Sequence, residues 1–497
     1  MNCKITVLPN NVTFETTKGE NLLIALARNK FFVTASCGGK GNCGKCKVAL
    51  LSGIVSGCEQ DSDGNVLSCK ANVESDLTVK LLQSVERKDE TFTADKTASY
   101  SVALDVGTTT LVASLIDEQS GKTVLKTAQL NPQGVLGADV LSRIQAYSEG
   151  NGTILHDLIV DKTQQILQGF TAQTGAKINE LIVTANTTML HIFLGVDPTP
   201  IGAYPFTPVF TCSKEIGGKE LSLDATVVRL LPSASSYVGS DVVSGVLACN
   251  MHEDNDVTML VDVGTNGEIV LKANGKMYGT STAAGPALEG AGIECGLGGV
   301  AGAIDSVDMK EGKIVYTTID GEPPTGICGS GIIDLIALLV REKIIDYSGT
   351  FDEESNSPLI NNLLGERFYV TDKVYLSQKD VRQFQLAKSA IVAGMKTLLI
   401  EKNVPLSEVK KVYLAGGLGQ YMSISSATQV GLLPADTQSV TVAVGNTALQ
   451  GAIKCVASKE TREKMDEIAT SIEIVELSTS AVFQDEYVEN MYFGSEE

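Results

Sequence analysis

Residues 102–110 read VALDVGTTT, and residues 259–267 read MLVDVGTNG. In both segments a run of apolar residues ends in Asp and continues as Val-Gly-Thr. Such a run predicts a buried strand that enters a tight glycine turn, where backbone N–H groups and threonine hydroxyls can surround a phosphate group. Because the pattern occurs twice, we expect two related halves, each a layered α/β unit.

The rest of the chain divides around these two segments. Its 497 residues are too many for a single hydrophobic core, so several folding units are expected. Residues 85–98 have few apolar side chains and no periodicity, which is typical of a linker. The predicted division is a small domain over residues 1–84, the linker, a first half over 99–250 and a second half over 251–497. At its end, residues 472–494 are expected to form a strand and a short aromatic stretch that packs back onto the body.

The small N-terminal domain has mixed secondary-structure signals. Apolar and polar residues alternate over residues 3–8 and 12–17, which predicts a β-hairpin. Residues 20–28 carry apolar side chains at helical spacing, and residues 77–81 indicate a closing strand. The domain therefore combines a small sheet with one helix, and its cysteine-rich segment lies between the helix and the last strand.

Four cysteines of this domain are spaced as metal ligands. Cys37, Cys43 and Cys46 follow a C-x5-C-x2-C pattern among glycines, and Cys69 lies downstream. Four thiolates hold a [2Fe-2S] cluster, which is therefore the predicted cofactor. Zinc is the alternative, but neither a second C-x2-C nor a histidine pair follows in this domain. Cys58 competes with Cys69 as the fourth ligand, and Cys69 is preferred because its Leu-Ser-Cys context resembles that of ferredoxins.

Composition excludes two classes of partner. The formal net charge of −20 argues against nucleic acid, whose phosphate backbone attracts basic surfaces. No run of about 18 apolar residues occurs, so no membrane span is expected. The N-terminus lacks the apolar stretch of a signal peptide, which predicts a cytoplasmic protein. In that reducing compartment the 11 cysteines are expected to ligate metal rather than to form disulfides.

A third glycine-rich turn extends the phosphate-binding pattern. Residues 410–421 read KKVYLAGGLGQY, and residues 183–194 and 328–339 match connecting elements in the same order. Together with the two Val-Gly-Thr turns, these segments resemble the nucleotide-binding elements of the superfamily that holds actin, sugar kinases and heat-shock chaperones. The resemblance implies that ATP and magnesium bind between the two halves. The expected residues are Gly107, Thr108 and Thr109 in phosphate loop 1, Gly264, Thr265, Asn266 and Gly267 in phosphate loop 2, and Gly416, Gly417 and Gly419 beside the adenosine.

Carboxylates are expected to organise the phosphate chemistry. Asp105 and Asp262 each lie at the end of a phosphate-loop strand, where they can hold magnesium through water, and they are the predicted catalytic residues. Asp139, Glu268 and Glu289 are candidates to orient the attacking water, although a structural role is favoured for each of them.

Four further segments carry a more specific resemblance. They are LNPQGVLGADVLSRI at 130–144, YVGSDVVSGVLA at 237–248, VDVGTNGEIVL at 261–271 and AAGPALEGAGI at 283–293. With ferredoxin-type cysteines joined to the ATPase elements, they resemble the reductive activators of corrinoid proteins over nearly the whole chain. The fold that this implies is α/β multidomain: an N-terminal β-grasp [2Fe-2S] ferredoxin domain followed by a two-lobed actin-like (ASKHA) ATPase.

The same resemblance implies a function. The family's activator transfers one electron from its [2Fe-2S] cluster to Co(II) of a corrinoid protein in a methyltransferase system, and ATP drives the regeneration of Co(I). An external low-potential donor would reload the cluster, and the oligomeric state is left open, with a homodimer as one option. The glycine- and alanine-rich loop at 279–292 is expected to approach the corrinoid with Ser281 or Thr282 near cobalt, or else to be a tight turn near the nucleotide.

Three other functions compete with this one. An activator of a radical dehydratase shares the ATPase fold but resembles a dimer that shares one [4Fe-4S] cluster, so iron content per chain separates the two. A redox-dependent sensor would bind a partner when ATP is bound, without partner-stimulated ATP turnover. A small-molecule kinase would need an acceptor site and a base, and neither is apparent in the sequence.

Overall fold

The computed structural model describes residues 2–8, 11–29, 31, 33, 35, 39, 41, 44–82, 99–175, 177–419 and 421–494. The predicted linker, residues 85–98, lies outside them. By its packing the chain divides into two compact units, residues 1–210 with 214–230 and residues 211–213 with 231–497. Each unit has an apolar core of its own and contains one of the two Val-Gly-Thr turns.

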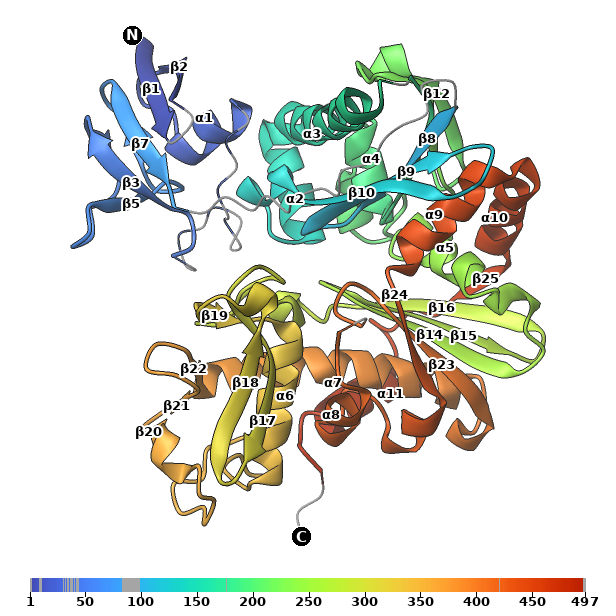
Figure 1. Ribbon diagram of the computed structural model, residues 1–497. Helices are drawn as coiled ribbons and strands as arrows, with labels where there is room; N and C mark the ends of the chain where they lie inside the picture. Colours follow the sequence, from blue (N-terminus) through green and yellow to red (C-terminus); the bar gives the residue numbers. More distant parts are fainter. Residues whose placement is uncertain are drawn as a thin grey trace. The chain divides into compact units, whose positions relative to one another are not determined.

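The N-terminal part of the first unit is a small sheet with one helix (Figure 1). Its strands lie in the order β2-β1-β7-β3-β5, with β1 antiparallel to β2 and parallel to β7, which confirms the predicted hairpin and closing strand. The helix begins at Leu22 rather than Glu20, because the Asn21 side chain caps it. The elements are β1 (Asn2–Leu8), β2 (Val12–Thr17), α1 (Leu22–Arg28), β3 (Lys47–Ser52), β4 (Val55–Ser56), β5 (Asn65–Leu67), β6 (Asn72–Val73) and β7 (Leu77–Leu81).

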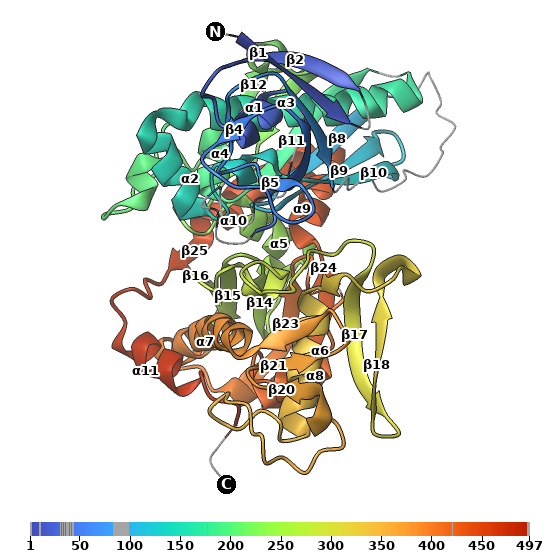
Figure 2. The same ribbon diagram turned by 90° about the vertical axis from the view of Figure 1, so that its left-hand side faces the viewer.

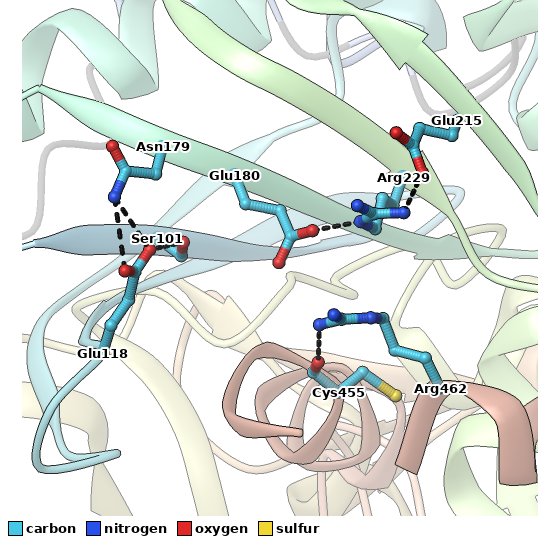
Figure 3. Close-up of polar contacts among 8 residues, drawn as sticks. All are labelled: Ser101, Glu118, Asn179, Glu180, Glu215, Arg229, Cys455 and Arg462. Carbon is cyan, nitrogen blue, oxygen red and sulfur yellow. Dashed lines mark hydrogen bonds and ion pairs between the residues drawn. The ribbon is translucent and has the colours of Figure 1, made fainter. Parts of the chain in front are cut away.

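The α/β part of the first unit is built on a six-stranded sheet in the order β10-β9-β8-β11-β13-β12. Strands β8, β11 and β13 run parallel. Strand β9 pairs antiparallel with β8, β10 with β9, and β12 with β13. Arg229 of β13 pairs with Glu180 of β11 and Glu215 of β12, which ties three neighbouring strands together (Figure 3). The elements are β8 (Tyr100–Val106), β9 (Thr110–Asp117), β10 (Thr123–Leu130), the 3-10 turn η1 (Pro132–Val135), α2 (Val140–Ala146), α3 (Gly152–Thr174), β11 (Ile178–Ala185), α4 (Thr187–Phe193), β12 (Lys214–Gly217) and β13 (Ala225–Leu230).

The second unit contains a six-stranded sheet in the order β24-β23-β14-β15-β16-β25. Counted within each sheet from the strand that bears the Val-Gly-Thr turn, both large sheets contain the order third, second, first, fourth: β10-β9-β8-β11 in the first and β16-β15-β14-β23 in the second. In both, the first strand is antiparallel to the second and parallel to the fourth. The predicted internal duplication corresponds to this shared local topology around the two turns. The strands are β14 (Val257–Val263), β15 (Gly267–Ala273), β16 (Lys276–Thr282), β23 (Val409–Ala415), β24 (Thr441–Gly445) and β25 (Ile472–Ile474).

Helices cover both faces of this second sheet. Gly267 of β15 faces Ile391 of α7, whereas the next residue, Glu268, faces Asp241 of α5. Because successive side chains of a strand point to opposite faces, α7 and α5 lie on opposite sides. Figure 2 shows the β17–β18 hairpin at one side of the unit, beside α6. The remaining elements are α5 (Ser240–Ala248), β17 (Ala303–Lys310), β18 (Lys313–Thr318), β19 (Gly326–Ile327), α6 (Gly329–Arg341), β20 (Leu363–Leu364), β21 (Arg367–Tyr369), β22 (Tyr375–Ser377), α7 (Gln378–Glu401), α8 (Ile424–Gln429), α9 (Thr447–Ala457), α10 (Lys459–Ser471) and α11 (Ala481–Glu489).

The C-terminal segment packs back onto the body of the second unit, as predicted, although its aromatic stretch is the helix α11. Lys388 of α7 is 1 % exposed, and its amino group donates hydrogen bonds to the backbone oxygens of Asn490 at 2.6 Å and Tyr492 at 2.7 Å. The Ser389 hydroxyl donates to the backbone oxygen of Tyr487. Polar side chains inside α7 thus hold the end of the chain.

Candidate functional site

Two of the four predicted cluster ligands come together in the described residues. Cys46 precedes β3 and Cys69 follows β5, and their Sγ atoms lie 3.1 Å apart. The hydroxyl and backbone N–H of Ser68 donate to the Cys46 backbone oxygen at 2.8 and 2.9 Å, and the Asn21 amide donates to the Cys69 backbone oxygen at 2.9 Å. The backbone of both cysteines is therefore fixed. Cys37 and Cys43 lie outside the described residues.

Cys58, the competing fourth ligand, has a different environment. Burial raises the pKa of its thiol, and a hydrogen bond with the backbone of Leu67 opposes that shift. The short distance between the Cys46 and Cys69 sulfurs favours Cys69 as the fourth ligand.

Phosphate loop 1 is held by its backbone oxygens. Asn131 donates from its side-chain amide to the Gly107 oxygen and from its backbone N–H to the Thr109 oxygen, both at 2.8 Å. Arg143 Nη2 donates to the Thr108 oxygen at 2.5 Å. All three carbonyls of residues 107–109 are thus bonded to the segment that follows β10. Asp105 lies one residue before the end of β8, in register with Thr184 of β11.

Arg143 is a buried residue in contact with loop 1 that the sequence prediction missed. It is 1 % exposed, and burial lowers the pKa of its guanidinium to about 9. Its other hydrogen bonds go to the Gln133 side chain at 3.2 Å, the Gly137 oxygen at 3.0 Å and the Met189 sulfur at 3.1 Å. A buried arginine is uncommon, so an arginine within the apolar pattern of 130–144 was a usable signal.

Phosphate loop 2 has a side-chain contact that involves one candidate acid. The Thr265 hydroxyl donates to the Glu289 carboxylate at 2.7 Å, and the Gly264 N–H donates to the Asn266 oxygen at 3.0 Å. Gly267 is required by packing, because an added Cβ would lie 2.8 Å from Ile391 of α7. This loop is therefore positioned by both Glu289 and helix α7.

Three carboxylates gather beside loop 2. Asp262 is in β14, Glu268 in β15 and Asp241 in α5. Burial raises the pKa of Glu268 well above its ordinary value, and the nearby charges of Asp241 and Asp262 raise it further. Burial also raises the pKa of Asp241 to about 6. Such a group of acids favours a bound proton, because each negative charge destabilises the others.

The third glycine turn contacts the end of β14, the strand that leads into loop 2. Ala415, the last residue of β23, pairs with Asp262 of β14. Gly416 follows with φ +94°, and an added Cβ would lie 2.5 Å from the Val263 oxygen and 2.8 Å from an Asp262 carboxylate oxygen. Gly417 has open space around it. The structure thus places the start of the third glycine turn against Asp262 and Val263, at the end of the strand that leads into loop 2.

Asp139 has the structural role that the sequence favoured, whereas the prediction for residues 279–292 needs correction. Asp139 caps α2: its carboxylate accepts from the Ser142 N–H at 2.7 Å, so a structural role explains it.

The loop predicted at 279–292 begins only after Thr282, because β16 includes its first four residues. Gly279 is a strand glycine that makes room for Ile472, from which an added Cβ would be 2.7 Å. Thr282 is 3 % exposed and donates to a backbone oxygen in β15, so its side chain points into the core.

The fold and the site define a class of protein, an iron–sulfur ferredoxin domain fused to an actin-like nucleotide-binding region. Three family models match in sequence order. Residues 5–74 match the 2Fe-2S iron-sulfur cluster binding domain, residues 100–254 the RACo middle region, and residues 256–497 the C-terminal domain of RACo, the ASKHA domain. Within the described residues no helix is both long and apolar enough to cross a membrane.

Relatives match along most of the chain. The corrinoid activation enzyme RamQ of Eubacterium limosum is 33% identical over 419 residues, which are 80% of this chain and 70% of that protein. The [Co(II) methylated amine-specific corrinoid protein] reductase of Methanosarcina barkeri is 26% identical over 428 residues, 78% of this chain and 76% of that one. A solved reductive activator for corrinoid, iron-sulfur protein has a TM-score of 0.74 at 27% identity and covers 99% of this chain and 98% of its own. The chain therefore belongs to the RACo family of reductive activators, and it acts as a corrinoid-protein reductase with an ASKHA ATPase domain.

Proposed function

We propose that this protein uses ATP with magnesium to drive one electron from its iron–sulfur domain to Co(II) of a corrinoid protein, which regenerates Co(I). The observation that carries the proposal is that converging cluster thiols and two phosphate loops occur in one chain of this family. When bound, a [2Fe-2S] cluster of the plant type supplies one electron near about −400 mV. Co(II) corrinoids are harder to reduce, and a gap of about 100–200 mV corresponds to about 2–5 kcal/mol for one electron.

The cysteine donor set fits a [2Fe-2S] cluster. Cys46 and Cys69 supply two thiolates that already converge, and Cys37 and Cys43 would complete the set of four. Cys46 is fully buried, so its thiolate is shielded from water. An external low-potential donor must reload the cluster after each electron leaves.

The carboxylates of the nucleotide region would serve ATP and magnesium. Asp105 and Asp262 each lie near the end of the strand that leads into a Val-Gly-Thr turn, β8 and β14, where a carboxylate can hold hydrated magnesium through water. Glu289 positions Thr265 and Glu268 lies next to Gly267, so both acids adjoin loop 2. Differential binding between two states of the protein can supply about 1–3 kcal/mol, and more in strong cases, toward this unfavourable electron transfer. ATP hydrolysis would then reset the protein.

The partner class that we propose is a corrinoid protein of a methyltransferase system. The Methanosarcina relative is a reductase of a methylated amine-specific corrinoid protein, which indicates the kind of partner without fixing its methyl donor. We propose that the reaction takes place in the cytoplasm, where thiols stay reduced and available for iron. A net charge of −20 makes nucleic acid an unsuitable partner.

An anaerobic assay tests this function. Protein, a chemical reductant and a candidate corrinoid protein are mixed with or without ATP, and the Co(I) absorption band is followed. We expect Co(I) only with ATP, and about two irons per chain. Asp262→Asn should lower ATP turnover about a hundredfold or more while the cluster stays reducible, because the magnesium-organising carboxylate is lost.

A matched control is Asp256→Asn, which removes an exposed carboxylate of the same unit and should leave turnover unchanged. Equal Co(I) formation without ATP would contradict the proposal. Four irons per chain would instead favour the dehydratase-activator alternative.

A further inference from the structure

The ferredoxin domain packs on the rest of the first unit through a small apolar cluster. Leu23 of α1 and Cys46 contribute from the ferredoxin side, and Val135 of η1 and Leu158 of α3 contribute from the other side; all four are 5 % exposed or less. Gly39 of the cysteine loop adds a backbone contact, since an added Cβ would lie 3.0 Å from the Val135 oxygen. We call the receiving surface the ferredoxin seat; its residues are Val135, Leu136, Ile154 and Leu158.

The ferredoxin seat is hydrogen-bonded to phosphate loop 1. Asn131 accepts from the Gln133 N–H at 3.0 Å, which starts the η1 turn, and its amide donates to the Gly107 oxygen at 2.8 Å. The Gln133 side chain donates to the Leu155 oxygen of α3 at 2.8 Å. Asn131 thus contacts phosphate loop 1, and Gln133 connects η1 with α3, the two elements that carry the seat.

Arg143 makes the second connection between loop and seat. Nη1 donates to the Gln133 side-chain oxygen at 3.2 Å, and Nη2 donates to the Thr108 oxygen at 2.5 Å. A planar guanidinium fixes both acceptors at once, which a lysine ammonium cannot do in the same geometry. A shift of the Thr108 carbonyl therefore changes the position of Gln133, and with it the seat.

We propose that nucleotide binding at phosphate loop 1 is coupled through Asn131, Gln133 and Arg143 to docking of the ferredoxin domain on its seat. This inference rests on the proposed function, because it requires loop 1 to bind nucleotide phosphates. The docked form places Cys46 in the same apolar cluster as Val135 and Leu158, so docking covers that edge of the cysteine site. Nucleotide would thereby control when the edge is open to an electron partner, and by linkage docking would change nucleotide affinity by the same factor.

The first test needs no mutation. Hydrogen–deuterium exchange is measured on the full chain with its cluster, with and without a non-hydrolysable ATP analogue and magnesium. We expect exchange in α1 and η1 to change about threefold or more, while β3, outside the contact, stays the same. Nucleotide binding is measured on the same sample by calorimetry. Absent binding refutes the proposed function, whereas tight binding with unchanged exchange in α1 refutes the coupling alone.

The second test removes the arginine fork. Arg143→Lys keeps a positive charge, and we expect α1 to lose its response when the variant is saturated with the analogue. Arg229→Lys is the matched control in the same unit, because Arg229 pairs with carboxylates of the sheet and not with loop 1 (Figure 3). Calorimetric unfolding of each variant shows that it is folded. A wild-type response in saturated Arg143→Lys would overturn the route through this residue.

Discussion

Lys388 gives a pH-dependent prediction for the stability of the second unit. Burial lowers the pKa of its amino group from 10.5 to about 7, because the charged form loses its hydration. The unfolded chain keeps the proton up to about pH 10.5, whereas the folded chain releases it near pH 7. The folded state is therefore favoured as pH rises between these two values, and below about pH 7 the pH dependence disappears.

The size of this effect follows from the two pKa values. Between about pH 7 and about pH 9, proton release in the folded state contributes about 2 kcal/mol to the free energy of unfolding. For a unit of this size, that corresponds to about 4–8 °C in melting temperature. Other groups titrate in the same interval, so the quantity to measure is how the difference between the wild type and Lys388→Met, which lacks this titrating group, changes with pH.

Differential scanning calorimetry at the two pH values measures that difference. The melting temperature of the wild type should rise relative to Lys388→Met by about 4–8 °C from about pH 7 to about pH 9. Lys379→Met is the matched control, because Lys379 is exposed on the same helix. A difference that stays constant with pH would refute the assignment of a buried, easily deprotonated lysine, whatever the absolute stabilities.

The remaining predictions concern the cofactor sites. Cys69→Ser should abolish the EPR signal of the reduced cluster and Cys58→Ser should keep it, and the reverse result would make Cys58 the fourth ligand. Gly416→Ala should weaken nucleotide binding about tenfold or more, because its φ is +94° and the new methyl would lie 2.5 Å from the Val263 oxygen. Gly417→Ala has open space and should bind normally; equal affinities in the two variants, measured by calorimetry, would contradict this reading of the turn.

Local patterns predicted much of the fold because they report on local structure. The two Val-Gly-Thr strands and the N-terminal hairpin follow from periodicity in the sequence, and the structure confirms them. Gly279 shows the limit of such patterns. Its small side chain suggested a loop, yet it lies within β16 because Ile472, far away in the chain, occupies the space beside it.

The site could be predicted from the sequence only where the residues in contact are close together in the chain. Asp139 and Ser142 have the spacing of a capping box, so its structural role could have been found from the sequence. The bond from Arg143 to Thr108 spans 35 residues, and no local pattern specifies such a contact. Cys46 and Cys69 lie between these two cases in predictability. Their ferredoxin-like spacing predicted that both are ligands, but only the fold brings their sulfurs close together.

The way phosphate loop 1 is held bears on how its chemistry could be altered. Asn131 and Arg143 bind backbone oxygens of the loop at 2.5–2.8 Å, whereas the Thr108 hydroxyl accepts a longer hydrogen bond, 3.4 Å, from the Asn186 amide. Substitutions at these two threonines can therefore change which phosphate groups or metal ions are preferred without dismantling the turn. For protein engineering, the segment that follows β10 is therefore the part to leave unchanged, and the two threonines are the positions to vary.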